Sequence, residues 1–266
     1  MAAARELRDV DLVSVDSTQV YRGMDIGTAK PSTSDRAEIR HHLLDLVDPT
    51  DEFTVAEFHI AYTEAIASIG QSGRRALLVG GTGLYHRVVV DDFDLPGQWP
   101  ELRAELEAEP DTTELFARLT DLDPLAAEKM EPSNRRRVVR ALEVIIGSGR
   151  PFSSFGPGVD EYPTSEVTQV GLRWPRDVLT HRITARVHDM VSAGLFEEVA
   201  AVEARGGFSR TAAQALGYKE ILDAMAGRIS NDEAIDMIIT RTRQFAVRQE
   251  RWFRRDPRVR WIDIDA

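Results

Sequence analysis

Residues 12–31, LVSVDSTQVYRGMDIGTAKP, decide the fold. The apolar run at 12–15 predicts a short buried strand. Asp16 follows directly, and Ser17, Thr18 and Gln19 add hydroxyl and amide groups. Open α/β sheets bind ligands beyond the carboxyl ends of their strands, so this order of residues predicts a site that begins at Asp16.

Composition narrows the class of protein. The chain has 266 residues, of which 42% are hydrophobic, and no cysteine, which excludes disulfides and thiolate metal sites. No apolar run approaches the ~20 residues that span a bilayer, and MAAARELRDVD lacks the apolar stretch of a secretory signal. We therefore expect a cytoplasmic protein without membrane contact.

The net charge of −11 argues against indiscriminate binding of nucleic acid, although it permits a local basic surface. Only Lys30, Lys129 and Lys219 are lysines, so almost all positive charge is arginine. Arginine suits bidentate contacts with phosphate, but a compositional bias of the genome would give the same excess.

The spacing of apolar residues, together with capping residues, glycines and prolines, predicts the remaining helices and strands. We expect helices at 2–8, 54–69 (with Thr54 as N-cap), 176–205, 211–226 (interrupted by Gly217) and 231–255, and strands at 10–15, 76–79, 167–172 and 259–264. Strand, helix and strand in alternation predict a parallel α/β sheet. Residues 95–162 carry repeated prolines between short amphipathic runs, which predicts a helical insertion that returns through a linker at 153–163. The core would then comprise 1–94 and 163–266.

Each candidate group also has a purely structural interpretation. Asp16 is either a general base or the cap of a turn. Thr28 and Lys30, in the glycine-containing loop 23–31, either bind phosphate or belong to an ordered turn. The turn 80–83, GGTG, either approaches an anion or packs tightly against a neighbour.

The arginines likewise have a functional and a purely structural interpretation. Arg182 and Arg186 lie four apart on one predicted helix, so they share a face that suits a diphosphate or faces solvent. A cluster at 135–140 and a second group at 241–255 are candidate contacts for a phosphate backbone.

Six segments, taken together and in order, resemble the tRNA dimethylallyltransferase family: VDSTQVYRGMDIGTAKP, LLVGGTGLY, RRRVVRALEV, HRITARVHDM, QALGYKE and TRQFAVRQERWF. The resemblance implies a P-loop-kinase-like parallel α/β core with a helical insertion that contacts tRNA. It also implies transfer of a dimethylallyl group from dimethylallyl diphosphate to N6 of the adenosine beside the anticodon. The implied partners are the tRNA anticodon stem-loop and dimethylallyl diphosphate, with Mg²⁺ as cofactor at ligands that the sequence leaves unassigned. We expect a monomer.

The resemblance also assigns roles to residues. Asp16 is similar to the family's catalytic carboxylate, and Arg186 to the arginine that holds the diphosphate. It implies a substrate-binding set of Ser17, Thr18, Gln19, Thr28, Lys30, Thr82, Gly83 and Arg182. It implies tRNA contacts at Arg103, Arg136, Arg137, Val138, Val139, Arg140, Gln214, Ala215, Leu216, Gly217, Tyr218, Lys219, Arg243 and Arg248.

One family feature is missing from these residues. The sequence contains no Gly-Lys dipeptide, and hence no G-x-x-x-x-G-K-[ST] loop of the kind that precedes this signature in the family. We expect that loop and its strand to lie upstream of Met1, and the sheet to show a gap in their place. Two alternatives stay open: an isopentenyltransferase acting on free adenine nucleotides, and a non-catalytic protein that binds tRNA.

Overall fold

The computed structural model describes residues 1–156, 158 and 161–264, so the predicted linker 153–163 lies partly outside the described residues. The chain divides into two compact units, 1–90 with 165–266, and 91–164. The insertion expected at 95–162 lies within the second unit. None of the described helices is long and apolar enough to cross a membrane.

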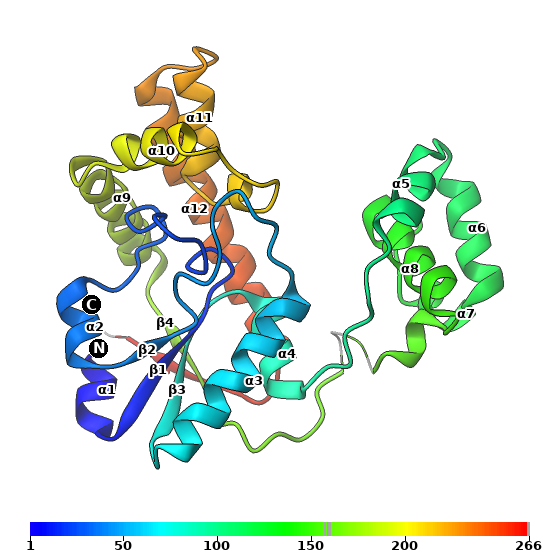
Figure 1. The fold of residues 1–266 in the computed structure, drawn as a ribbon, viewed down its shortest axis with the longest axis horizontal. Helices are drawn as coiled ribbons and strands as arrows, with labels where there is room; N and C mark the ends of the chain where they lie inside the picture. The colour runs from blue at the N-terminus through cyan, green and yellow to red at the C-terminus, as the bar shows by residue number, and fades with distance from the viewer. Residues whose placement is uncertain (157, 159–160, 265–266) are drawn as a thin grey trace. The chain divides into compact units, whose positions relative to one another are not determined.

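The core unit is built on parallel strands (Figure 1). β1 (Val10–Val15) lies between β2 (His41–His42) and β3 (Arg75–Gly80), and both pair with it in parallel. β4 (Gln169–Arg173) pairs in parallel with β5 (Val259–Asp263) in a separate sheet. The parallel α/β class is therefore confirmed, and the described strands form two separate sheets.

Exposure differs sharply between β1 and β3. All six residues of β1 are buried, because apolar side chains cover both faces of the strand: Val13 and Val15 lie in one cluster, and Val10 and Leu12 lie in another. The strand predicted at 76–79 is confirmed within β3, but its predicted burial is wrong: Val79 is 55% exposed. Within the described residues β3 pairs only with β1, so its other edge and part of its face stay open.

Local signals fix the beginnings of several helices that surround the sheets. α1 (Ala2–Leu7), α2 (Thr33–Glu38), α3 (Val55–Gln71) and α4 (Gly83–Asp91) belong to the N-terminal half. Thr54 is the N-cap of α3, as predicted: its hydroxyl accepts from Glu57 N–H, and the Glu57 carboxylate accepts from Thr54 N–H.

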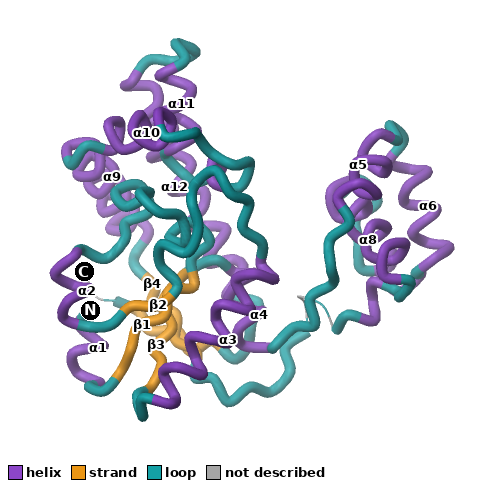
Figure 2. The backbone as a smooth tube through the Cα atoms, viewed as in Figure 1, coloured by secondary structure: helices purple, strands orange, loops and turns teal. Residues whose placement is uncertain are grey.

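The prediction of one continuous helix at 176–205 is wrong. The structure has α9 (Arg176–Ser192) and α10 (Leu195–Ala204), which Figure 2 shows as two helices. Gly194 between them has φ +100°, a left-handed conformation that ends an α-helix and that glycine adopts without steric cost.

The predicted interruption of the helix at 211–226 is confirmed: Gly217, with φ +96°, separates η2 (Ala212–Gln214) from α11 (Tyr218–Met225). The last helix, α12 (Asn231–Phe253), is continuous, and it begins two residues after the Gly227–Arg228 turn at the N-cap Ser230.

The second unit has a core of its own. It comprises α5 (Pro100–Ala108), α6 (Thr112–Leu122), α7 (Pro124–Glu128), α8 (Arg135–Ser148) and η1 (Phe152–Ser154), without a strand in its described residues. Leu106, Leu119 and Leu142 are buried together between these helices. The amphipathic runs at 95–162 therefore fold as helices that bury one face, as predicted.

Candidate active site

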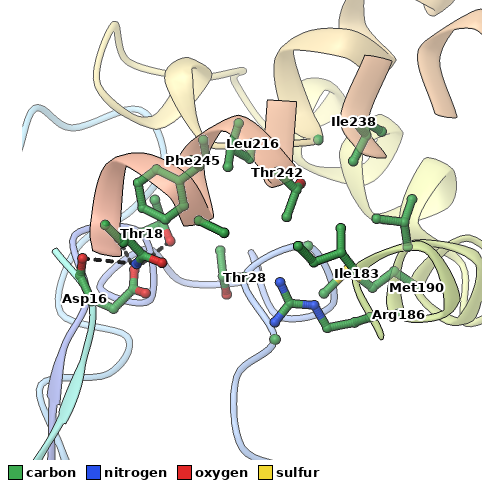
Figure 3. Close-up of a pocket in the computed structure, with 18 of the residues that line it drawn as sticks. Asp16, Thr18, Thr28, Ile183, Arg186, Met190, Leu216, Ile238, Thr242 and Phe245 are labelled. Carbon is green, nitrogen blue, oxygen red and sulfur yellow. Dashed lines mark hydrogen bonds between the residues drawn. The ribbon is translucent and has the colours of Figure 1, made fainter. Parts of the chain in front are cut away.

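A cavity of about 1080 Å³ opens in the core unit beyond the carboxyl end of β1. Its walls come from the loop after β1, the glycine turn after β3, and helices α9 and α12. Figure 3 shows Asp16 and Thr18 on one side, Arg186 on the other, and Thr28 between them. The position agrees with the rule that places ligand sites at the carboxyl ends of parallel strands.

Asp16 combines the two interpretations that its sequence position allows. Thr18 donates to Asp16 Oδ1 from its backbone N–H (2.8 Å) and from its hydroxyl (2.7 Å). Asp16 therefore does cap a turn, and these two bonds fix its carboxylate while leaving the second oxygen free of them. A carboxylate held in this way at the wall of a cavity is able to accept a proton from a bound ligand.

The glycine turn is tied to this strand end. Ser17 N–H donates to Thr82 Oγ1 (3.1 Å), and the Thr82 hydroxyl lies 3.3 Å from Ser17 Oγ. A Cβ on Gly83 would lie 2.4 Å from Trp252 Nε1, so this glycine permits a close approach to α12. The glycine turn therefore does pack tightly against a neighbour, which was one of its two interpretations. Thr82 and Gly83 also line the cavity.

Gln19 is occupied by the protein itself. Its side-chain oxygen accepts from the Ser14 hydroxyl (2.8 Å), and its Nε2 donates to the carbonyl of Thr28 (3.0 Å). The structure therefore places this amide as a brace between β1 and the loop that carries Thr28, rather than as a group open to a substrate.

The prediction that Lys30 binds phosphate is wrong. Its side chain is only 1% exposed, and its ammonium donates to the Tyr21 carbonyl (2.5 Å), to Asp25 (2.7 Å) and to Asp45 (2.6 Å). Three acceptors match the three N–H bonds of an ammonium group. Although burial opposes it, the positive charges of Lys30 and Arg36 lower the pKa of Asp45 below its usual value.

Arg182 and Arg186 both line the cavity from α9, but their surroundings differ. The guanidinium carbon of Arg182 lies 4.3 Å from the centre of the Trp174 ring, a cation–π arrangement. Arg186 points into the cavity toward Thr28 (Figure 3). Its side chain makes no hydrogen bond or ion pair within the part of the chain that the structure describes.

Several cavity residues escaped the sequence reasoning, among them three on α12. Phe245, Gln249 and Trp252 line the cavity from α12, and Gln249 Nε2 donates to the Gly81 carbonyl (3.0 Å). Their spacings of four and three put them on one helix face, which was the available signal. Phe245 and Trp252, together with Ile183, Met190, Leu216 and Ile238, make much of the wall apolar.

Comparisons with known proteins show the family. The family model described as IPP transferase matches residues 19–256. The chain belongs to the IPP transferase family. It is 47% identical over 259 residues to a tRNA dimethylallyltransferase of Kineococcus radiotolerans, covering 96% of this chain and 81% of that protein. A tRNA dimethylallyltransferase of Thermobifida fusca is 46% identical over 263 residues, with the same two shares.

Solved structures give the same family. The full-length tRNA isopentenylpyrophosphate transferase of Bacillus halodurans is similar with a TM-score of 0.69 and 39% identity, covering 98% of this chain and 84% of that one. A eukaryotic dimethylallyltransferase described as acting on tRNA shares the fold, with a TM-score of 0.79 at 24% identity.

In this IPP transferase the segment predicted to touch tRNA after α10 is divided between surface and core. Gln214 and Lys219 are exposed, whereas Ala215 and Tyr218 are buried. Burial, together with the neighbouring Glu198 carboxylate, raises the pKa of Tyr218 well above its usual value, so its hydroxyl stays protonated. Leu216 and Gly217 line the cavity, so the structure assigns this segment at least partly to its wall.

The two arginines of α12 in the predicted set are accessible. Arg243 is exposed and donates to the Thr184 hydroxyl (2.9 Å). Arg248 is exposed at the cavity and lies 5.9 Å from the centre of the Phe245 ring. Their contact with tRNA stays a prediction.

Within the insertion of this IPP transferase, part of the predicted tRNA set is wrong. Val138 and Val139 are buried in the core of the unit, so their side chains are closed to a ligand. Arg140 donates to the carbonyls of Pro96 and Gly97 (both 3.0 Å).

Arg140 and Arg103 also share a buried carboxylate. Arg140 Nη1 lies 2.9 Å from Glu143 Oε1, and Arg103 Nη1 lies 3.9 Å from Glu143 Oε2. Arg103 further donates to Glu107 (2.9 Å). These two arginines therefore hold the insertion together, because a buried carboxylate needs such partners. Arg136 and Arg137 are exposed instead, and their side chains have no ion pair with any residue that the structure describes.

Proposed function

We propose that the protein transfers the dimethylallyl group of dimethylallyl diphosphate to N6 of the adenosine beside the anticodon in tRNA. One observation carries the proposal: Asp16 and Arg186, a carboxylate and an arginine from distant parts of the chain, line the same cavity. Relatives named tRNA dimethylallyltransferase that match over 96% of this chain support it. They give no support to the nucleotide-specific or non-catalytic alternatives.

The residues on each wall of the cavity have a role in the proposed transfer reaction. The amine nitrogen forms a bond to the allylic carbon of the donor while the bond from that carbon to the diphosphate oxygen breaks. Asp16 accepts the proton that the amine loses. Arg186 stabilises the negative charge that grows on the departing diphosphate. The apolar side chains of Ile183, Met190 and Leu216 suit a five-carbon prenyl chain.

Mg²⁺ is part of the proposal. The described residues contain no group of three or more His, Cys, Asp or Glu side chains that would hold a metal ion by themselves. The cavity does offer the Asp16 carboxylate and the hydroxyls of Ser17, Thr18 and Thr28. Because Asp16 is assigned the proton, the hydroxyls would hold Mg²⁺ together with the donor's phosphates, and Mg²⁺ commonly keeps several waters in such sites. When bound, Mg²⁺ would neutralise charge on the diphosphate.

The test is an assay of the chain with labelled dimethylallyl diphosphate and an unmodified anticodon stem-loop, over a range of Mg²⁺ concentrations. We expect label on the RNA, and none when guanosine replaces the adenosine beside the anticodon. Label on AMP but not on the RNA would favour the nucleotide-specific alternative. Salt-dependent binding of RNA without turnover at any Mg²⁺ concentration would favour the non-catalytic one.

Cellular location and assembly are further parts of the proposal. We propose a monomer that acts in the cytoplasm, where tRNA is available. Light scattering during gel filtration measures the mass, which we expect near the 29.8 kDa of one chain. A mass near twice that value would contradict the monomer.

A further inference from the structure

A carboxylate outside the cavity holds the loop that forms one of its walls. Glu198, in the first turn of α10, accepts from three consecutive backbone N–H groups: Asp25 (2.8 Å) and Ile26 (2.7 Å) through Oε2, and Gly27 (3.1 Å) through Oε1. Consecutive amides that converge in this way form an anion-binding concavity. Here the chain fills that concavity with its own side chain.

A second contact fixes the same loop from another element. The Tyr218 hydroxyl donates to Glu198 Oε1 (2.6 Å), and the Tyr218 ring lies against Gly27. A Cβ on Gly27 would lie 2.5 Å from Tyr218 Cε2, so only glycine allows this approach. Glu198 and Tyr218 therefore clamp Gly27 between a hydrogen-bonded carboxylate and an aromatic ring.

The break between α9 and α10 gives Glu198 its position. Gly194 turns the chain with φ +100°, and Glu198 N–H donates to the Gly194 carbonyl (2.9 Å). The first turn of a helix also favours a negative charge, because the free N–H groups there carry partial positive charge. The preceding residue, Glu197, shares that turn but is exposed.

We propose that Glu198 is a positioning residue that fixes the Thr28 wall of the cavity and thereby sets the affinity for the prenyl diphosphate. Thr28 and Ala29 follow the clamped Gly27 directly and line the cavity. In Figure 3 the Arg186 guanidinium points toward Thr28 and both line the cavity, so a displaced loop would change the space in which a diphosphate meets that arginine. The identity of the ligand rests on the proposed function, whereas the clamp itself does not.

The test compares Glu198→Gln with the matched variant Glu197→Gln. Both remove one negative charge from the same helical turn, but only the first places an amide N–H₂ against backbone donors. For Glu198→Gln we expect amide exchange at residues 25–27 to rise, because the loop loses charge-assisted hydrogen bonds. The Kd for dimethylallyl diphosphate, measured by calorimetry, should rise about tenfold or more, because the loop then spends a smaller fraction of time in the binding position. RNA affinity and kcat at saturating donor should change less than about threefold. Glu197→Gln should resemble the wild type.

Each other outcome has a defined meaning. Unchanged amide exchange, or faster exchange with an unchanged donor Kd, would overturn the inference. Failure of the wild type to prenylate RNA would count against the proposed function, while exchange and calorimetry would still report on the clamp. If Glu198→Gln fails to fold, Tyr218→Phe removes one of the four bonds to Glu198 and should shift exchange and donor Kd in the same direction by a smaller factor. No shift in that variant would overturn the inference.

Discussion

Helices α8 and α9 each carry two arginines four residues apart, and the structure uses the two pairs differently. On α8 of the insertion, Arg136 is exposed, whereas Arg140 donates to the protein's own carbonyls. On α9 of the core unit, Arg182 stacks on Trp174 while Arg186 points into the cavity. A spacing of four therefore guarantees a shared face but not a shared partner.

The acceptors within reach explain the difference. Near Arg140 the insertion offers the buried Glu143 carboxylate and two backbone carbonyls, which occupy the guanidinium. The cavity wall carries the Asp16 and Asp189 carboxylates among hydroxyls, glycines and apolar side chains, but within the described residues neither carboxylate forms an ion pair with Arg186. A basic residue is available to a ligand where its own chain leaves its charge unpaired.

The largest expected effect tests the wall opposite Arg186. Asp16→Asn should lower kcat by about 10²- to 10⁴-fold, because asparagine is nearly isosteric but cannot accept the amine proton. The affinity for RNA should stay nearly unchanged. Single-turnover kinetics with labelled donor measure the step directly, and a rate above about a tenth of the wild type would remove Asp16 from the role of base.

The next effect separates the two arginines of α9. Arg186→Ala should lower kcat by about 10²- to 10³-fold and raise the donor Kd, since the charge that it stabilises grows in the transition state. Arg182→Ala should cost about tenfold or less, the scale of one cation–π contact. Measuring kcat and the donor Kd for both variants tests this difference. Equal effects of the two substitutions would show that Arg182 and Arg186 act as one unit.

Lys30→Met tests whether a buried cation in the loop is structural. Asp25 and Asp45 would lose their common partner, and we expect the free energy of unfolding to fall by about 1–3 kcal/mol. Fully buried pairs lose more, but Asp25 is largely exposed. Urea titrations followed by circular dichroism give the value. An unchanged stability combined with a raised donor Kd would restore the phosphate-binding role that the contacts of Lys30 contradict.

The smallest effect concerns α8 and sharpens the contrast within it. Replacing Arg136 and Arg137 together by alanine should reduce the slope of log K for RNA against log salt by about 1–2, with no loss of thermal stability. Arg140→Ala should lower the thermal stability, because Glu143 is then buried with fewer partners. It should leave the slope of log K for RNA against log salt unchanged. If the double variant kept the wild-type slope, the exposed arginines of α8 would be an ordinary solvated face.

Local sequence alone determined much of this molecule. The strand before Asp16, the Thr54 cap and the helical character of the insertion all follow from interactions over a few residues. The resemblance carried by six segments indicated the family that the comparisons show. These features can be predicted from the sequence because turns, caps and amphipathic faces depend on residues that are close together in the chain.

Only the tertiary structure decided which polar groups remain available. Lys30, Gln19 and Arg140 have the residue types of a binding site, yet acceptors 9 to 44 residues away occupy them. Glu198 has no motif of its own, yet it binds amides more than 170 residues away in the chain. Hydrogen bonds between distant segments form only when the chain has folded, so sequence patterns propose candidates and the folded contacts select among them.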